Sequence, residues 1–420
     1  MTIDTTSNNA ECEHDPEQLR AALVADIRRR GIFQTPQVEE AFSRVPRHLF
    51  LPGVSLTDAY AQQVVVTKQD EDGSALSSAS KPSIVAMMLE QLDVRPGDNV
   101  LEIGAATGIN AALLAELAGP SGSVTTIEID QELAEGARAA LAGAAYDTVT
   151  AVCGDGADGY PVAAPYDRII VTAGAWDIST AWWDQLAVGG RIVVPLVLHG
   201  SGLTRSIAFH KTSTDRMVSD SVRVCGFIGM RGTLADTTSR RIVITEDLTL
   251  QLDTRLDVDE AALRDAFATD AVQDTHWTGL LIDHAQRTEH LDLWLATTIA
   301  TAEVAYARLL AGRVARDTGT ANPTLRWGGA ALHDARTGTT TYLTLRDHDD
   351  HTEKIGIVTC GADIAARQSL TERTRALLAR WDAERPIEPA VTAITAGAPG
   401  QRLPDGYRVD KPDTRLIITW

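Results

Sequence analysis

The chain has 420 residues, of which 44% are hydrophobic and 23% charged, a composition typical of a globular protein long enough for two domains. Its formal net charge of -19 argues against a nucleic-acid partner, which would need a basic face. Four cysteines without Cys-x-x-Cys spacing predict neither a disulfide framework nor a metal site, and the lack of long apolar runs or a signal sequence predicts a cytoplasmic protein without a membrane span.

The N-terminal region is expected to combine a tail with a helix. Residues 1–16 are polar and acidic, and we expect a disordered tail there. Residues 17–30 carry apolar side chains at helical spacing and are followed by Gly31, which predicts a helix. Arg28–Arg30 suit the dipole at the end of this helix, so we interpret them as a solvated cap rather than a phosphate site.

A polar stretch separates this helix from the next one that the sequence clearly predicts. Residues 67–80 have few apolar anchors, and they predict a loop. Pro82, which suits the first turn of a helix, precedes a predicted helix over 83–92.

The central part of the chain alternates predicted strands and helices from Asn99 onward. Short apolar runs bounded by turn residues predict strands at 99–103, 123–129, 149–154, 167–173 and 191–198. Helices are predicted at about 109–118, 131–142 and 179–187. This order implies a parallel sheet, and the apolar runs Leu203–His210 and Val222–Met230 predict an antiparallel hairpin after it. The first folded domain is therefore expected over 17–235.

The remainder of the chain, 240–420, mixes strand-like and helical patterns and predicts a second, α+β domain. The strand-like runs are Ile242–Thr245, Thr324–Trp327, Thr340–Leu345, Ile355–Thr359 and Arg415–Thr419. The clearest helix is predicted over Asp363–Arg385. We interpret the segment Asp347–His351 as a solvated turn between strands rather than as a metal site.

A turn of small residues follows the first strand of the alternating region. Val100–Gly108 reads VLEIGAATG, in which glycines let the backbone approach a ligand and the next helix offers unpaired N–H groups. Glu128 ends the following strand, where an acid can bind both hydroxyls of a ribose. Together they predict an adenosine-containing cofactor. Glu102 would repel a pyrophosphate but suits the cationic groups of S-adenosylmethionine, which is therefore favoured over a dinucleotide.

A further strand end adds to this predicted site. Gly154-Asp155-Gly156 closes one apolar run and precedes another, Ile169-Ile170-Val171. Open α/β sheets hold their ligands at the carboxyl ends of such strands. Asp155 is therefore expected to accept a hydrogen bond from the adenine amino group.

These segments together resemble the protein-L-isoaspartate O-methyltransferases, which are class I S-adenosylmethionine-dependent enzymes. The resemblance covers roughly residues 17–232 and includes Val45–Pro52 (VPRHLFLP), Ala164–Ala175 (APYDRIIVTAGA) and Gly189–Leu196 (GGRIVVPL). It implies a Rossmann-like α/β fold with a mostly parallel, seven-stranded sheet, here followed by the additional C-terminal α+β domain. It also implies a peptide or protein substrate that carries an aspartyl or isoaspartyl side chain.

The resemblance extends to an active-site serine, with some departures. Ser78-Ala79-Ser80-Lys81-Pro82 stands where the family has a Thr-Ile-Ser-Gln-Pro-like signature, so Ser80 is the expected catalytic residue, and Ser78 and Lys81 are expected to contact substrate. Ala106 stands where the family usually has glycine. The residues expected to bind S-adenosylmethionine are Glu102, Gly104, Ala105, Gly108, Glu128, Ile129, Asp155, Gly156 and Thr172. Thr172–Gly174 are expected to line the floor near the transferred methyl group.

A carboxylate substrate makes few demands on the enzyme. Because its unperturbed pKa is about 4, it is ionised at neutral pH and methyl transfer needs no general base. The enzyme must align the attacking oxygen and exclude water. We expect Ser80 to orient the carboxylate through a hydrogen bond. Esterification replaces a poor leaving group on the carboxyl carbon by a better one, methanol, so a backbone nitrogen can close a succinimide.

Two substrates fit this chemistry. One is the isoaspartyl carboxylate of damaged proteins, which corresponds to repair. The other is an aspartate in a ribosomally made, cyclised peptide, as in elongated actinobacterial relatives, some of them labelled as part of an FxLD lanthipeptide system. The roughly 180 extra residues and the altered serine loop favour peptide maturation, with 240–420 as the region that recognises the peptide. A peptide-binding scaffold that has lost turnover is the alternative of another class, and a nicotinamide dehydrogenase is a distant third.

Three other features have structural interpretations. Trp182-Trp183 lies on a predicted helix and is assigned to the core rather than to substrate stacking. His48 lies in a segment that we interpret as structural rather than catalytic. Cys153 is expected to be buried in its strand and chemically inert.

Overall fold

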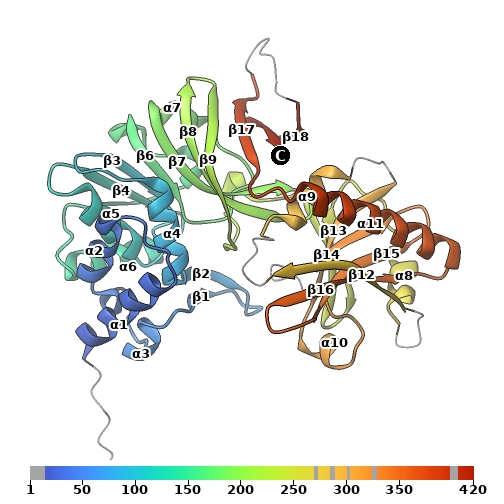
Figure 1. Cartoon of the computed structure of the whole chain (residues 1–420). Coiled ribbons are helices and arrows are strands. Elements are labelled where there is room, and N and C mark those ends of the chain that lie inside the picture. The colour runs from blue at the N-terminus through green and yellow to red at the C-terminus, as the bar shows by residue number, and fades with distance from the viewer. Residues whose placement is uncertain (1–14, 269–272, 284–288, 300–302, 324–328, 398–404) are drawn as a thin grey trace, which may run out of the picture. The chain divides into compact units, whose positions relative to one another are not determined.

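The computed structural model describes residues 15–268, 273–283, 289–299, 303–323, 329–397 and 405–420. The chain forms two compact units, whose elements can be followed in Figure 1. The first runs to Thr172 and includes Asp184–Val193, and the second comprises Ala173–Trp183 and the chain from Val194 to Trp420. The limits of these units differ from the domain boundary expected at 235–240. That domain boundary stays a prediction. None of the helices in the described ranges is long and apolar enough to cross a membrane.

The N-terminal part of the first unit is helical. Its helices are α1 (Pro16–Arg29), α2 (Pro36–Arg44), η1 (Arg47–Phe50), α3 (Leu56–Ala59) and α4 (Pro82–Leu92). Asp15 caps α1 by accepting a hydrogen bond from the backbone N–H of Glu17 at 2.9 Å. At the other end of α1, Arg28 forms an ion pair with Glu39 on α2. Of the predicted tail, residues 1–14 lie outside the described part of the chain, and Pro16 already belongs to α1.

The stretch predicted as a loop, 67–80, is largely a β-hairpin, so that prediction was wrong. Strands β1 (Val65–Gln69) and β2 (Ala75–Ala79) pair antiparallel, and Gly73, at φ +84°, lies in the turn between them. The Thr67 hydroxyl donates to Ser77 Oγ at 3.0 Å across the pair. The turn sequence Asp72-Gly73, which favours a hairpin, was the signal for it in a stretch with few apolar side chains.

A parallel sheet forms the centre of the first unit, as predicted. Its strands are β3 (Asn99–Ile103), β4 (Ser123–Glu128), β5 (Thr150–Cys153), β6 (Tyr166–Val171) and β7 (Leu186–His199), in the order β7-β6-β3-β4-β5. The intervening elements are α5 (Ile109–Ala118), α6 (Gln131–Gly143), η2 (Gly156–Asp158), η3 (Pro161–Ala163) and α7 (Thr180–Gln185). Strand β5 is an edge strand, and Cys153 at its end is exposed. The expected burial of Cys153 was therefore wrong, because burial depends on the position of the strand in the sheet.

The second unit begins its own strands with the predicted hairpin. Strands β8 (Leu203–Ser213) and β9 (Arg216–Val224) pair antiparallel. The second strand was misplaced by the prediction, because β9 ends at Val224 and includes only the first three residues of the run Val222–Met230. With β3–β7, β8 and β9 are the seven strands expected from the resemblance. Strands from the end of the chain, β17 (Ala390–Thr395), β18 (Tyr407–Asp410) and β19 (Thr414–Thr419), continue the order beyond β9 as β9-β17-β19-β18. The predicted strand Arg415–Thr419 is confirmed as part of β19.

The rest of the second unit is an antiparallel sheet of seven strands. Its strands are β10 (Ser239–Thr245), β11 (Leu248–Asp253), β12 (Gln273–Asp283), β13 (Val304–Ala311), β14 (Gly329–Asp334), β15 (Thr339–Asp347) and β16 (Thr352–Cys360), in the order β10-β11-β13-β14-β15-β16-β12. Helices η4 (Gly232–Leu234), α8 (Glu260–Ala266), α9 (Leu291–Thr298), α10 (Arg313–Asp317) and α11 (Ile364–Glu384) accompany it. Helix α11 contacts β12, β15 and β16, and in Figure 1 it runs along this sheet.

Most predictions for this region are confirmed. The expected strands within β10, β15 and β16 are present, and the expected helix is α11, with Asp363 as its N-cap. The segment Asp347–His351 forms the connection from β15 to β16, and no group of residues suited to a metal ion occurs in the described ranges. The predicted strand Thr324–Trp327 lies outside the described residues.

Candidate functional site

The turn between β3 and α5 has the backbone conformation that its glycines predict. Gly104 and Gly108 have φ values of +101° and +84°. A Cβ on Gly104 would lie 2.6 Å from Thr172 Oγ1, so only glycine fits beside β6. Ala106 also has a positive φ, +46°, at the position where the resembling family usually has glycine. The turn therefore keeps its shape despite this alanine, at the cost of some backbone strain.

The end of β4 is bound directly to this turn. Glu128 Oε2 accepts a hydrogen bond from the backbone N–H of Ala106 at 2.9 Å, and Oε1 accepts from that of Asp130 at 3.2 Å. The Glu128 side chain is largely buried, whereas the next residue, Ile129, is exposed. The structure thus brings together three parts of the expected cofactor site, because Gly104 and Ala105 also donate backbone hydrogen bonds to the Ile127 carbonyl.

Glu102 lies beneath this turn and is completely enclosed. Its carboxylate accepts from Asn110 Nδ2 at 2.8 Å and from the Thr126 hydroxyl at 2.7 Å. Burial raises the pKa of Glu102 to about 7, although both hydrogen bonds oppose the rise. Because the carboxylate is enclosed, it does not face a ligand directly, and a role of Glu102 in cofactor binding stays a prediction. The sequence analysis did not identify Asn110 or Thr126 as its partners, because neither follows a local motif.

The two remaining strand ends carry the other expected cofactor residues. Asp155 caps η2 by accepting from the backbone N–H of Ala157 at 2.9 Å, and the Gly154 N–H donates to the Glu128 carbonyl at 2.9 Å. Gly156 is buried at the start of η2. Thr172 Oγ1 lies 2.9 and 2.7 Å from the carbonyl oxygens of Ile103 and Gly104. Its hydroxyl therefore fixes the glycine turn, while a direct contact with the cofactor stays a prediction.

The residues of this turn fit an adenosine-containing cofactor. Among the described residues, the Thr107 hydroxyl is buried and has no hydrogen-bond partner, so a polar group of a ligand can satisfy it. Gly104 and Gly108 leave no Cβ over the turn, and α5 begins there with its backbone N–H groups. The polar groups at the turn are a carboxylate, a hydroxyl and backbone amides, which suit the sugar and amino-acid parts of S-adenosylmethionine.

The expected catalytic serine lies where β2 leads into α4. Ser78 belongs to β2, Ser80 follows it, and Lys81 is the N-cap residue of α4. Arg47 Nη2 donates to the Ser80 carbonyl at 3.2 Å, and Arg47 Nε donates to the Ala59 carbonyl at 2.8 Å. Burial lowers the pKa of Arg47 to about 10, so the guanidinium remains charged at neutral pH. Arg47 thus holds the backbone of Ser80 in place.

A lysine joins the β1–β2 hairpin, which leads to Ser80, to the start of α6 just after Glu128. Asp130 lies two residues after Glu128. Lys68 Nζ, on β1, donates to its Oδ1 and Oδ2 at 3.0 and 2.9 Å. It also bonds to Glu132 at 2.8 Å. Lys68 and Arg47 were not among the residues expected from the sequence. An arginine within the mostly apolar run Val45–Pro52 was an available signal, since a buried arginine needs partners.

The residues given structural interpretations lie in structural positions. Trp182 and Trp183 are both buried, and Trp183 Nε1 donates to Thr414 Oγ1 at 3.0 Å. His48 Nδ1 lies 2.8 Å from the Tyr60 hydroxyl. The burial of both tryptophans agrees with their assignment to the core, whereas the structural role of His48 stays a prediction.

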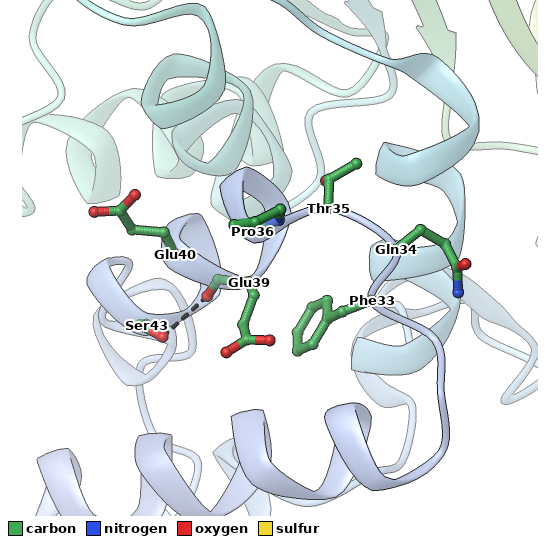
Figure 2. A pocket seen from close by; sticks show the side chains of 7 residues that line it. All are labelled: Phe33, Gln34, Thr35, Pro36, Glu39, Glu40 and Ser43. Atoms are coloured by element: carbon green, nitrogen blue, oxygen red, sulfur yellow. Dashed lines mark hydrogen bonds between the residues drawn. The ribbon is translucent and has the colours of Figure 1, made fainter.

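An acidic surface pocket of about 650 Å³ contains none of the predicted site residues. Figure 2 shows Glu39, Glu40 and Ser43 on α2, next to Phe33 and Gln34. The Ser43 hydroxyl donates to the Glu39 carbonyl at 2.9 Å, and Glu39 is already bound to Arg28. These polar groups are used within the helical region itself.

Comparison with known proteins agrees with this site. A family model described as protein-L-isoaspartate(D-aspartate) O-methyltransferase (PCMT) matches residues 18–235. The protein-L-isoaspartate O-methyltransferase of Ignicoccus hospitalis is 42% identical over 180 residues, which are 43% of this chain and 82% of the relative. That of Hyperthermus butylicus is 40% identical over 223 residues, which are 51% of this chain and 89% of the relative.

A solved structure of a protein-L-isoaspartate O-methyltransferase has a similar fold. It aligns with a TM-score of 0.50 and 21% identity over 89% of this chain and 96% of its own. The fold is therefore that of the class I, Rossmann-like methyltransferases with a further C-terminal region, and the cofactor is S-adenosylmethionine. The chain belongs to the protein-L-isoaspartate O-methyltransferase family.

Proposed function

We propose that this enzyme transfers a methyl group from S-adenosylmethionine to the side-chain carboxylate of an aspartyl or isoaspartyl residue in a peptide. The observation that carries the proposal is the link between the β1–β2 hairpin, which leads to Ser80, and the start of α6 just after Glu128. Lys68 ties the hairpin to Asp130, beside Glu128, while Arg47 fixes the backbone of Ser80. The match of residues 18–235 to the family supports the same reaction.

The residues of the site have distinct tasks in this reaction. When bound, S-adenosylmethionine supplies a methyl group on a positively charged sulfur. Glu128 accepts hydrogen bonds from the ribose hydroxyls, and Asp155 accepts one from the adenine amino group. Ser80 donates a hydrogen bond to one oxygen of the ionised substrate carboxylate, which leaves the other oxygen for attack on the methyl carbon. Alignment and exclusion of water lower the barrier, so no residue needs to remove a proton.

The methyl ester prepares the substrate for a second step without further catalysis. The following backbone nitrogen attacks the ester carbonyl, a carbon–nitrogen bond forms, and methanol leaves with the amide proton. The product is a succinimide, which water opens to aspartate or isoaspartate.

Peptide maturation is the first candidate for the biological role. Ala79 and Lys81 flank the expected catalytic serine in place of the bulky apolar residue and the amide of the resembling family, which argues for a different peptide. Protein repair is the second candidate, because a solved isoaspartate methyltransferase shares the fold over 89% of this chain. The C-terminal region therefore does not by itself distinguish the two roles. Location in the cytoplasm stays a prediction.

Labelled S-adenosylmethionine distinguishes these roles. The enzyme is incubated with a linear isoaspartyl peptide and with the cyclised product of a precursor peptide encoded beside the gene. Efficient labelling of the cyclised peptide supports maturation, whereas labelling of the linear peptide alone overturns it in favour of repair. If neither is labelled although calorimetry shows binding of S-adenosylhomocysteine, the chain acts as a scaffold.

Ser80→Ala tests the role of the serine. We expect kcat to fall at least about tenfold, because one hydrogen bond to a charged carboxylate contributes about 1.5–3 kcal/mol. The affinity for S-adenosylhomocysteine should remain unchanged in calorimetry. Ser43→Ala, which alters an exposed hydroxyl on α2, is the matched control. Unchanged turnover of Ser80→Ala would remove Ser80 from the site.

A further inference from the structure

A cavity of about 410 Å³ lies within the second unit, and every residue that lines it belongs to that unit. Its volume falls in the range of about 300–1,000 Å³ that is typical of sites for small ligands. The large apolar side chains of its wall all come from residues 197–230, namely Val197, Leu203, Val224, Phe227 and Met230. Polar side chains of β10 and β11 also line it. The cavity therefore suits a ligand that has both a polar and an apolar part.

Two polar side chains of the wall lie next to each other on neighbouring strands. Arg241 on β10 and Gln251 on β11 are directly opposite each other in the antiparallel pair, so their side chains share one face of the sheet. Ser239, two residues before Arg241, belongs to the same face and also lines the cavity. Arg240, between them, belongs to the other face, where it forms an ion pair with Glu260 of α8. The strand pair thus presents a guanidinium, an amide and a hydroxyl together.

The amide of Gln251 points to a ligand because it is enclosed without a partner. Gln251 is only 6% exposed, yet its side chain makes no hydrogen bond to any of the described residues. Buried polar groups in folded proteins are nearly always bonded, and an amide offers both donors and an acceptor. Gly202, at φ +75°, leaves the amide its place, since a Cβ at this position would collide with Gln251 Nε2. A ligand in the cavity can supply the partners that the chain does not.

Arg241 supplies a positive charge beside this amide. It is exposed while it lines the cavity, and within the described ranges it forms neither a hydrogen bond nor an ion pair. The two acids of the wall have other partners. Asp292 pairs with Arg205, and Asp236 accepts from the N–H and the hydroxyl of Thr238 at 2.8 and 2.7 Å. The planar donors of the Arg241 guanidinium match a carboxylate, which can accept two parallel hydrogen bonds from them.

We propose that this cavity binds the C-terminal residue of a peptide chain, with the terminal carboxylate on Arg241 and the last peptide group on Gln251. Opposite residues of an antiparallel pair lie about 4.5–5.5 Å apart, and the carboxylate and the preceding peptide group of a chain end are separated by one residue, about 3.8 Å. The Gln251 amide can donate to the peptide carbonyl and accept from its N–H. The terminal side chain is left to the apolar part of the wall. This site is independent of the proposed methyl transfer.

Calorimetry with the full chain, in the absence of S-adenosylmethionine, tests this site. The probes are acetyl-Gly-Gly peptides that end in alanine, leucine or phenylalanine, each with a free and with an amidated C-terminus. We expect at least one free-acid peptide to bind, and its amidated form to bind about tenfold more weakly, because the charge-assisted hydrogen bonds to the carboxylate are lost. The corresponding free amino acid should also bind more weakly, since an ammonium group replaces its peptide group.

Three variants assign the binding to the two strands. Arg241→Gln should weaken the free-acid peptide about tenfold and leave the amidated form unchanged, and Gln251→Leu should weaken it about fivefold. Gln251→Leu should not lower the free energy of unfolding in urea, because the amide has no hydrogen bond within the described chain to lose. Arg240→Gln removes the same charge from the other face of β10 and is the matched control, with peptide binding unchanged.

Several results would overturn the proposal. They are a lack of binding of all three free-acid peptides, equal affinity for the free-acid and amidated forms, and equal affinity for the peptide and the free amino acid. Unchanged affinity in both Arg241→Gln and Gln251→Leu, or an equal loss in Arg240→Gln, would do so as well. Loss of stability in Gln251→Leu with unchanged binding would show that the amide is structural. Because no cofactor is present, failure of the proposed methyl transfer leaves all of these measurements unaffected.

Discussion

At the scale of single residues, the glycine turn depends on an acid that has no contact with solvent. Asn110 and Thr126 hold the Glu102 carboxylate under the turn, and Glu128 lies close enough for its charge to raise the pKa of Glu102 further. The sequence placed Glu102 in the motif. Its burial, and hence its raised pKa, follows from the helix and the strand that enclose it.

This burial makes stability depend on pH in a defined direction. The pKa of Glu102 is about 7 in the folded chain, against about 4.3 in an unfolded one. Between these values the folded state holds a proton that the unfolded state has released, so the free energy of unfolding falls as the pH rises. Glu102→Gln cannot ionise, so relative to wild type it should be more stable at about pH 8 than at about pH 5.

Urea unfolding at several pH values measures this difference. Glu135→Gln, which alters an exposed glutamate on α6, is the control and should follow the wild-type curve. If Glu102→Gln also runs parallel to wild type, the carboxylate is not the source of the pH dependence.

At the scale of elements, the end of the chain fixes the segment that follows β6. Asp413 N–H donates to Asp177 Oδ2 at 2.7 Å, and Lys411 Nζ donates to the carbonyls of Trp176 and Val197. Burial lowers the pKa of Lys411 to about 7, while the charges of Asp177 and Asp236 oppose this. The loop at 173–183 is therefore held by residues more than 200 positions away in sequence.

Thr414→Val tests this attachment. The Thr414 hydroxyl accepts from Trp183 Nε1 and donates to the Ile178 carbonyl, both at 3.0 Å, and all three groups are buried. Valine has the same shape but leaves the indole N–H and the carbonyl without a partner, which should cost about 1–3 kcal/mol in the free energy of unfolding. Thr419→Val is the control on the same strand, because its hydroxyl lies 3.4 Å from the Ala390 carbonyl and is exposed. Equal losses in urea unfolding would refute the attachment.

At the scale of the whole molecule, the last strands complete the β-structure of the second unit. Strand β17 pairs with β9 on one side and with β19 on the other. Val391, Ala393 and Ile394 of β17 are buried, as are Leu416–Ile418 of β19. The final residues are thus part of a core rather than an appendage to the seven-stranded sheet.

Removal of residues 390–420 should therefore leave an insoluble protein. Strand β9 would lose its partner β17 and become an unpaired edge, which promotes association between chains. The soluble fraction after expression, compared with that of the full chain, measures the effect. A chain that lacks only Trp420 is the control, since this side chain is partly exposed. A soluble, monomeric product of the longer deletion would contradict the role assigned to these strands.

The sequence alone determined the parallel sheet and the cofactor turn, while the resemblance to the family named Ser80, whose role stays a prediction. The sheet and the turn rest on local patterns: apolar runs between turn residues, glycines at a strand end, or an acid at the end of the next strand. For the same reason Gly104, Glu128 and Asp155 could be named before their contacts were known. The hairpin over 65–79 was missed because its strands are short and rich in polar residues and carry no clear apolar pattern.

Only the tertiary structure decided the features that join distant segments. Lys68 donates a hydrogen bond to Asp130, Arg47 donates one to the Ser80 carbonyl, and β17 pairs with β9. Nothing in the local sequence specifies these partners. The position of β5 at the edge of its sheet likewise exposes Cys153, which the sequence predicted to be buried. Local patterns specify which residues form a strand or a turn, whereas the order of strands and the pairing of buried charges depend on the packing of the complete chain.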